Sequence, residues 1–178
     1  MSIECHIPFE GCHNFRDVGG NRTYDGRTVR WRRLFRSDSL LRMTDRDVTQ
    51  ARDQLGMASV MDLRQQQAIG WVGRGPLVDD QMRYHHFPLI EQDKVQAVER
   101  FRAFGSLSKS YLHDLADPKV GRQIAKALEA LADAEAYPAV FHCMAGKDST
   151  GLLAAVVLGT LGVVDEEIVS DYARRSRH

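Results

Sequence analysis

Short apolar runs alternate with amphipathic stretches along this chain, and the alternation predicts strands separated by helices. Residues 59–63 (SVMDL) and 138–141 (PAVF) are short and apolar, which is typical of strands buried in a parallel sheet. Between them, Val120, Ile124 and Leu131 recur at the spacing of one helix face. This succession predicts an α/β fold with a central, mainly parallel sheet flanked by helices.

Capping residues indicate where three of the predicted helices begin. Thr44, with Asp47 three residues later, has the pattern of a capping box. Asp117 followed by Pro118 places a capping side chain before a residue that suits the first helical position. The last predicted helix begins at Asp165. Along the sequence, these signals place two helices before the predicted strand at 138–141 and one after it.

The remaining segments have patterns of differing strength. Residues 27–36 (RTVRWRRLFR) alternate apolar and basic side chains and predict a strand, and residues 84–89 predict another. Residues 66–82 contain several Gly and one Pro, which indicates irregular chain. Residues 92–114 predict weakly amphipathic helix and could shape a substrate site as a lid. Residues 150–161 predict a helix that starts near its first residue, after the strand at 138–141.

Composition and charge narrow the class of protein. The 178 residues fit one domain, 1–178, and balanced charge (24 Lys+Arg, 24 Asp+Glu) gives no indication of nucleic-acid binding. The most apolar stretch, residues 152–164, is too short to span a bilayer, so we expect no transmembrane segment. The first residues lack a signal-peptide pattern and the chain has only 3 Cys. We therefore expect a cytoplasmic protein without a disulfide framework.

The segment after the strand at 138–141 carries the clearest candidate chemistry. The strand would deliver Cys143 to the carboxyl edge of the sheet, and a tight loop would then lead into a helix. Backbone N–H groups in such a loop, together with the positive end of the helix dipole, form a site for an anion of phosphate size. The same field would stabilise a thiolate, which makes Cys143 a candidate nucleophile. A buried structural cysteine is the alternative interpretation.

The whole motif resembles one known family. Residues 142–151, HCMAGKDSTG, resemble HCxxGKDRTG, the signature loop of a bacterial subgroup of cysteine-dependent tyrosine and dual-specificity phosphatases. Residues 14–20 (NFRDVGG), 34–38 (LFRSD) and 61–64 (MDLR) resemble further motifs of that subgroup in the same order. The resemblance implies the cysteine-phosphatase fold and a single phosphatase domain over 1–178. Relatives usually have further helices after the segment that matches residues 170–172, and we expect these helices to be missing from a chain that ends at His178.

The resemblance also implies roles for individual residues. The reaction would be phosphomonoester hydrolysis through a phosphocysteine. Three residues are implied as catalytic: the nucleophile Cys143, the general acid Asp148 and the point charge Lys147. The loop residues implied to bind phosphate are Met144, Ala145, Gly146, Lys147, Asp148 and Ser149. The residues implied to support the loop are His142, Thr150 and Asp62, with Thr150 either hydrogen-bonding the thiolate or capping the helix. Alternative general acids are Asp93, Asp114 and Asp117.

The implied partners are proteins that contain phosphotyrosine, and phosphoinositides are a further candidate substrate class. No cofactor or metal is implied. Cys5-His6 and Cys12-His13 offer zinc-ligand types, but their spacing matches no known zinc finger. The arginines of residues 27–36 could form a basic rim beside an anionic substrate or simply a solvated face.

Ser149 departs from the motif, which has Arg at this position. The planar guanidinium would grip two phosphoryl oxygens at once, and arginines in comparable roles are worth roughly 10³–10⁵ in rate. One serine hydroxyl cannot replace it, so we expect impaired turnover. Ser149 could be an engineered trap or the mark of a natural pseudophosphatase that binds phosphorylated ligands. An arginine from elsewhere, Arg36 or Arg64, could otherwise reach the site.

Overall fold

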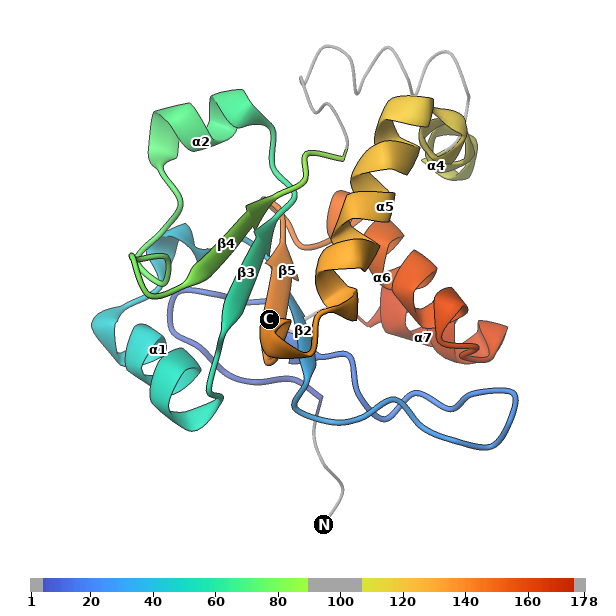
Figure 1. Ribbon diagram of the computed structural model, residues 1–178, viewed down its shortest axis with the longest axis horizontal. Coiled ribbons are helices and arrows are strands. Elements are labelled where there is room, and N and C mark those ends of the chain that lie inside the picture. The colour runs from blue at the N-terminus through green and yellow to red at the C-terminus, as the bar shows by residue number, and fades with distance from the viewer. Residues whose placement is uncertain (1–4, 90–106, 175–178) are drawn as a thin grey trace.

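The computed structural model describes residues 5–89 and 107–174, and these residues form an α/β fold around a five-stranded sheet (Figure 1). The strand order is β1-β2-β5-β3-β4, and only β1 runs antiparallel to its neighbour. The strands are β1 (Arg16–Asp17), β2 (Leu34–Ser37), β3 (Ser59–Asp62), β4 (Arg83–His86) and β5 (Ala139–His142). The predicted α/β class with a mainly parallel sheet is confirmed.

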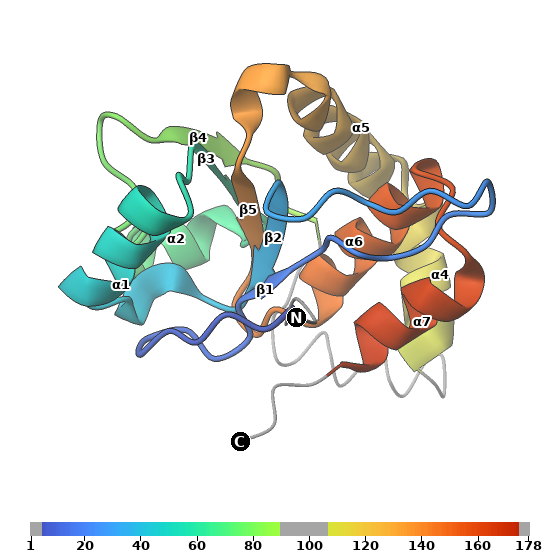
Figure 2. The same ribbon diagram turned by 90° about the horizontal axis from the view of Figure 1, so that it is seen from below.

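Helices cover both faces of this sheet, as Figures 1 and 2 show from two directions. One side carries α1 (Asp45–Thr49), which continues into a π-helical turn over Gln50–Gln54. The other side carries α5 (Pro118–Ala132) and α6 (Asp148–Thr160). The remaining helices are α2 (Gln66–Val72), α4 (Leu107–Ala116) and α7 (Asp165–Ala173), with short 3-10 turns at Leu40–Arg42 and Ala134–Ala136. No helix in the described ranges is long and apolar enough to cross a membrane.

The two faces of the sheet bury separate hydrophobic clusters because successive strand residues point to opposite sides. Val60 and Val140 pack with Phe35 and Ala51 on the α1 side. Met61 and Phe141 pack on the α5 and α6 side, where the predicted helix-face residues also lie. The predicted face residues of α5 that are buried there are Val120, Ile124 and Leu131.

Several predicted boundaries are confirmed. The capping box of Thr44 and Asp47 is present in both directions, and the Asp117 side chain accepts a hydrogen bond at the start of α5. The final helix begins at Asp165. At the starts of α1 and α5, a short polar side chain accepts a hydrogen bond from a free backbone N–H group, so these starts can be predicted from local sequence.

Three boundaries were wrong. The strand predicted over 27–36 is confined to β2, because Arg32 has a left-handed backbone (φ 59°) and turns the chain before Leu34. Residues 66–72 form α2 rather than irregular chain. Helix α6 begins at Asp148 with Lys147 at the N-cap, so Thr150 lies within the first turn and does not cap it. Part of the helix predicted over 92–114 lies outside the described residues; the described part forms most of α4.

The four parallel strands end in register at one edge of the sheet. Ser37, His142, Asp62 and His86 are the last residues of β2, β5, β3 and β4, and they lie side by side across the ladder. The segments that follow them therefore start at the same edge, where ligands bind in open α/β sheets. This edge holds the loop that contains Cys143.

Candidate active site

The loop between β5 and α6 packs closely against the backbone that follows β2. Cys143 follows β5 directly and is 6% exposed, and bends occupy the next four residues before α6 begins. Gly146 has a left-handed backbone (φ 65°), and a Cβ there would lie 2.6 Å from the backbone N of Asp38. Only glycine fits this position, because any side chain would collide with the chain that follows β2.

Two carbonyl groups of the loop are bound by its surroundings. The Met144 carbonyl accepts a hydrogen bond from the backbone N–H of Ser39 (3.0 Å). The Gly146 carbonyl accepts one from Asn14 Nδ2 (3.2 Å) and one from Arg36 Nη2 (3.0 Å). The segments 14–20 and 34–38, singled out in the sequence, and the adjacent Ser39 therefore hold the loop from behind.

These contacts decide where the loop amides point. In a trans peptide the C=O and the N–H point in opposite directions, so the N–H groups of Ala145 and Lys147 face away from Ser39, Asn14 and Arg36. The amides of the loop that donate to no described residue are those of Met144, Ala145, Gly146, Lys147 and Ser149. A loop with unpaired amides directed away from its support, at the start of a helix, suits an oxyanion.

A buried ion cluster ties this loop to α7. Arg36 Nη1 donates to Asp171 Oδ2 (2.5 Å), and Arg16 Nη2 donates to the backbone carbonyl of Asp171 (3.0 Å). All three residues are at most 4% exposed. Arg16 also donates to Asn14 Oδ1. Burial, and next the neighbouring Arg36 charge, lower the pKa of Arg16 to about 10, so the Arg16 guanidinium is still charged at neutral pH.

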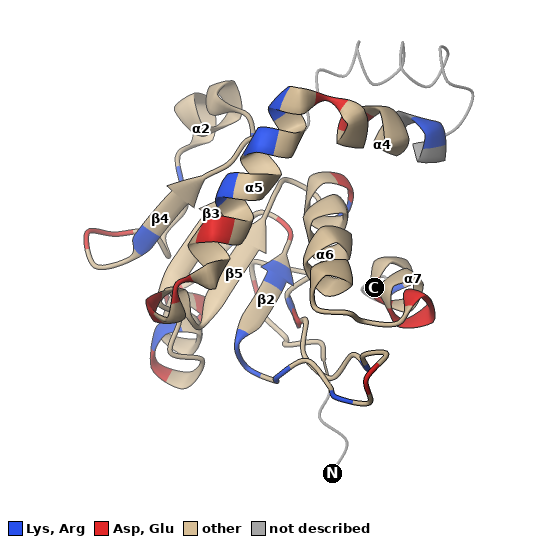
Figure 3. Cartoon of the chain, turned by 45° about the vertical axis from the view of Figure 1, so that its right-hand side comes forward, with Lys and Arg blue, Asp and Glu red and all other residues tan. Residues whose placement is uncertain are grey.

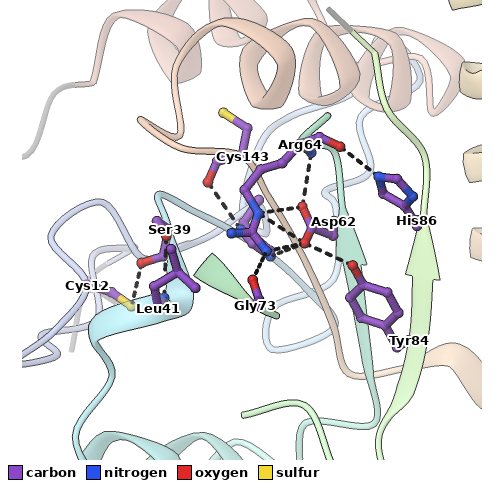
Figure 4. A network of polar contacts seen from close by, with 10 residues as sticks. Cys12, Ser39, Leu41, Asp62, Arg64, Gly73, Tyr84, His86 and Cys143 are labelled. Atoms are coloured by element: carbon purple, nitrogen blue, oxygen red, sulfur yellow. Dashed lines mark hydrogen bonds and ion pairs between the residues drawn. The ribbon is translucent and has the colours of Figure 1, made fainter. Parts of the chain in front are cut away.

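A second buried cluster lies at the end of β3 (Figure 4). Arg64 makes a bidentate ion pair with Asp62, through Nε (2.9 Å) and Nη2 (2.5 Å), and Tyr84 donates to the same carboxylate (3.0 Å). Burial raises the pKa of Asp62, but the hydrogen bonds from Arg64 outweigh it and leave that pKa below its usual value. Burial lowers the pKa of His142, which favours its neutral form.

The Asp148 carboxylate belongs to a third group of side chains. Tyr111 of α4 donates a hydrogen bond to Asp148 Oδ1, and its hydroxyl lies 3.2 Å from that of Tyr172 on α7. Burial, and next the hydrogen bond to Asp148, raise the pKa of Tyr111, so the phenol keeps its proton and remains a donor. Asp148 itself is half-buried in the first turn of α6.

The structure brings most of the implied site residues to this one loop. Met144, Ala145 and Lys147 are exposed, whereas Ser149 and Thr150 are buried. The Thr150 hydroxyl has no hydrogen-bond partner among the described residues. In Figure 4 the Cys143 sulfur points away from the cluster at the end of β3.

The alternative residues lie elsewhere. Arg36 and Arg64, considered as replacements for the missing arginine, are each held by a carboxylate and a backbone carbonyl. Asp117 caps α5 and Asp114 is buried on α4, while Asp93 lies outside the described residues. Burial, and next the charge of Asp38, raise the pKa of Cys12 to about 12, which argues against it as a nucleophile.

Sequence reasoning missed the residues that hold the loop from a distance. Asp171 and Tyr111 meet Arg36 and Asp148 only through the tertiary fold, because 135 and 37 residues separate the partners in the chain. The signal available was the presence of Arg16 and Arg36 within predicted core segments, since a buried arginine requires an acceptor.

Fold and loop together define a protein of the cysteine-phosphatase class. The chain belongs to the tyrosine phosphatase family, whose model matches residues 7–178. It is 31% identical over 190 residues to the triple specificity protein phosphatase PtpB of Mycobacterium tuberculosis, covering 92% of this chain and 67% of PtpB. It is 28% identical over 180 residues to a putative tyrosine-protein phosphatase of Cupriavidus necator, covering 93% of this chain and 61% of the relative.

The fold is also similar to a solved structure of low sequence identity. The catalytic domain of the PP-IP phosphatase Siw14 from S. cerevisiae matches with a TM-score of 0.53 at 17% identity, covering 93% of this chain and 75% of that domain. A third relative, a tyrosine-protein phosphatase of Nostoc commune, is 31% identical over 143 residues, covering 78% of this chain. The chain spans between 46% and 67% of the length of the three relatives matched by sequence.

Proposed function

We propose that this chain binds phosphate monoesters in the loop of residues 143–149 and is a tyrosine-phosphatase-type hydrolase whose turnover is limited by Ser149. The observation that carries this proposal is the restraint of the Met144 and Gly146 carbonyls, which turns the neighbouring amides away from their support. The start of α6 adds roughly half a positive charge at the same loop. Family membership supports the same chemistry.

In the proposed reaction, the Cys143 thiolate attacks phosphorus in line with the ester oxygen. A phosphorus–sulfur bond forms as the phosphorus–oxygen bond breaks, and the leaving oxygen takes a proton from Asp148. Water then attacks phosphorus, gives a proton back to Asp148, and releases phosphate and the thiolate. The loop amides hold the equatorial oxygens throughout. The unpaired Thr150 hydroxyl is available to donate to the thiolate in the free enzyme.

Tyr111 has a positioning role in this proposal. Its hydrogen bond fixes the Asp148 carboxyl group, and its contact with Tyr172 connects the acid to α7. Lys147 is exposed at the N-cap of α6 and adds a point charge for an anionic substrate. Arg36 acts from behind the loop, through the Gly146 carbonyl, rather than on the phosphoryl group.

Ser149 favours a second candidate function, a silent protein that binds phosphorylated ligands. The loop is held without an arginine at 149, because the residues that hold it, Asn14, Arg36 and Ser39, come from other segments of the chain. Binding through amides can therefore persist where catalysis is lost. The proposed ligand is phosphotyrosine in proteins, with phosphoinositides as a further class, in line with the subgroup motif HCxxGKDRTG.

Turnover of an aryl phosphate tests these proposals in four proteins: the unchanged chain, Ser149→Arg, Ser149→Arg with Cys143→Ser, and Gln54→Arg. We expect Ser149→Arg to raise kcat/KM by roughly 10³–10⁵ because a bidentate cation then follows charge into the transition state. Cys143→Ser should abolish the gain. Gln54→Arg, an exposed arginine added on the turn after α1, should leave turnover unchanged.

A further variant tests the general acid. In the Ser149→Arg background, Asp148→Asn should lower kcat by roughly 10²–10⁴.

Phosphate binding by calorimetry separates the two functions. An inactive Ser149→Arg protein that is folded by circular dichroism and binds a phosphotyrosine peptide as tightly as the unchanged chain would support the binding protein. Failure of both proteins to bind phosphate or peptide would contradict both functions.

A further inference from the structure

The arginines of residues 27–36 do not gather at the loop of residues 143–149, which is called the phosphate loop below after its proposed ligand. Arg36 holds that loop from behind, and Arg32 lies 3.9 Å from the buried Asp17 carboxylate. Arg27, Arg30 and Arg33 instead line a separate cavity of about 740 Å³. Figure 3 shows the basic positions of this segment immediately before β2, at the end of the molecule away from α2 and α4.

This cavity lies at the opposite end of the sheet from the phosphate loop. Leu34 starts β2 and lines the cavity, whereas Ser37 ends β2 at the loop edge. The last turn of α6, with Val157 and Thr160, also lines it. Because a helix rises 1.5 Å per residue, that turn is roughly 15–18 Å from Asp148 at the start of the helix. The cavity is therefore a different site.

The floor of the cavity is apolar and comes from elements far apart in the sequence. Helix α5 contributes Leu128 and Leu131, and the end of α6 contributes Val157 and Leu161. The volume lies within the roughly 300–1,000 Å³ of pockets that bury a small organic ligand. An alkyl chain or an aromatic ring would be stabilised here by the removal of apolar surface from water.

The charged residues that line the cavity all have one sign. The lining contains three arginines and no Asp or Glu. Arg27 is paired with Asp25 (2.6 Å) and Arg33 lies over the Tyr137 ring (5.0 Å), whereas Arg30 has no ion-pair partner among the described residues. The C-terminal ends of α5 and α6 contribute only about half a negative charge each. The positive charge of the arginines therefore exceeds the partial negative charge of the two helix ends.

Local backbone geometry places these arginines. In a continuous strand, Arg30 and Arg33 would point to opposite faces. The left-handed conformation of Arg32, whose N–H donates to Asp17 Oδ2 (2.8 Å), interrupts the alternation between them. Both side chains then line the same cavity.

From this arrangement we infer that the cavity binds a small amphipathic anion, with an alkyl or aryl group on the apolar floor and a carboxylate at Arg30 and Arg33. Guanidinium groups bind carboxylates through paired N–H donors, and Arg30 is available for such a contact. This site does not depend on the proposed phosphatase activity, because it shares no residue with the phosphate loop.

Calorimetric titration with decanoate, kept below its micellar concentration, tests the inference. Decanoate should bind saturably with one site per chain, and neutral decanol should bind at least about tenfold more weakly because it lacks the charge that the arginines bind. Arg30→Gln should weaken the binding of decanoate by about tenfold or more. Leu161→Glu, at a half-exposed position of the lining, should abolish measurable binding by repulsion.

Arg46→Gln provides the matched control, because Arg46 is an exposed arginine that pairs with Glu10 outside the cavity. It should bind decanoate like the unchanged chain, and circular dichroism should show all variants folded. The inference is overturned by equal binding of decanoate and decanol, by Arg30→Gln and Arg46→Gln having the same effect, or by the absence of saturable binding. If inorganic phosphate displaces decanoate from Arg30→Gln as readily as from the unchanged chain, decanoate binds at the loop of residues 143–149, and the inference is equally overturned.

Discussion

Two buried ion clusters lie close to the sheet edge that holds the loop of residues 143–149, and they differ in their balance of charge. The Arg16–Asp171–Arg36 cluster has two guanidiniums for one carboxylate and uses an unmatched donor to hold the Gly146 carbonyl. The Asp62–Arg64 cluster has one of each, and its remaining contacts include the Tyr84 hydroxyl and the Gly73 carbonyl. Because the first cluster has more guanidinium N–H donors than its carboxylate can accept from, Arg36 can also donate to the loop carbonyl of Gly146.

The balanced cluster acts on neighbouring strands instead. Asp62 ends β3, Tyr84 lies on β4, and His142 Nε2 at the end of β5 is 3.8 Å from the carboxylate. Its charges cancel locally, so it fixes strand ends without adding a donor to the loop. The comparison indicates that the unbalanced cluster is the more costly to disturb, since loss of its single carboxylate leaves two buried guanidiniums without a charged partner, against one in the balanced cluster.

The largest expected effect is therefore that of Asp171→Ala. It leaves Arg16 and Arg36 buried without a carboxylate, and we expect a loss of about 3–5 kcal/mol in the free energy of unfolding. Urea denaturation measures this. The double variant Asp171→Ala with Arg36→Met should be less destabilised than Asp171→Ala alone, and a double variant that loses the full sum of both single effects would argue against the cluster.

Asp62→Asn is expected to cost less, about 1–3 kcal/mol in the free energy of unfolding. The asparagine oxygen still accepts from Arg64, and Arg64 Nη2 keeps its hydrogen bond to the Gly73 carbonyl (3.0 Å). Asp171→Asn, measured in the same urea experiment, ranks the two carboxylates by the same substitution. A larger loss for Asp62→Asn than for Asp171→Asn would reverse the comparison between the clusters.

The balanced cluster should also make stability depend on pH. The folded-state pKa of His142 is lowered by burial, so below about pH 6.5 the unfolded state binds more protons and stability falls. Asp62 has a lowered pKa as well, and its stabilisation, present above about pH 4, is lost as the pH falls through the folded value. Urea midpoints between pH 7 and pH 5 should fall less steeply for His142→Gln than for the unchanged chain, and parallel curves would contradict this assignment.

The smallest effect is expected at an exposed pair. Arg83 and Asp133 lie 3.0 Å apart, and each side chain is about half exposed. Arg83→Gln should change the free energy of unfolding by less than about 1 kcal/mol, because solvent screens such pairs. This variant sets the baseline in the urea series, and a loss comparable to that of Asp62→Asn would mean that burial is not what separates the pairs.

Local sequence was sufficient for features that depend on neighbouring residues. The capping box at Thr44 and the start of α5 at Asp117 follow from side chains that bond backbone groups two or three residues away. The α/β class follows from periodicity. The strand ending at 141 was placed within one residue of β5.

Features that depend on tertiary contacts were not predictable from the sequence. Arg32 turns the chain before β2 because the buried Asp17 carboxylate accepts its N–H, and no local signal indicates this. The sequence predicted the loop of residues 143–149 as a phosphate site. It did not predict that Asp171 holds Arg36 behind the loop, because these two residues meet only when α7 packs against α6. Arg64, considered for the site, is retained by Asp62, two residues earlier in the chain.

Gly151, in the first turn of α6, sets a limit on how far the protein can be shortened. A Cβ there would lie 2.6 Å from the Tyr172 ring, so the aromatic ring fills the space that a side chain would otherwise take. A truncated protein that stops before Tyr172 would leave that space open beside Arg36, whose Nη2 is 3.6 Å from the same point. The smallest fragment able to hold the loop in shape must therefore run through α7.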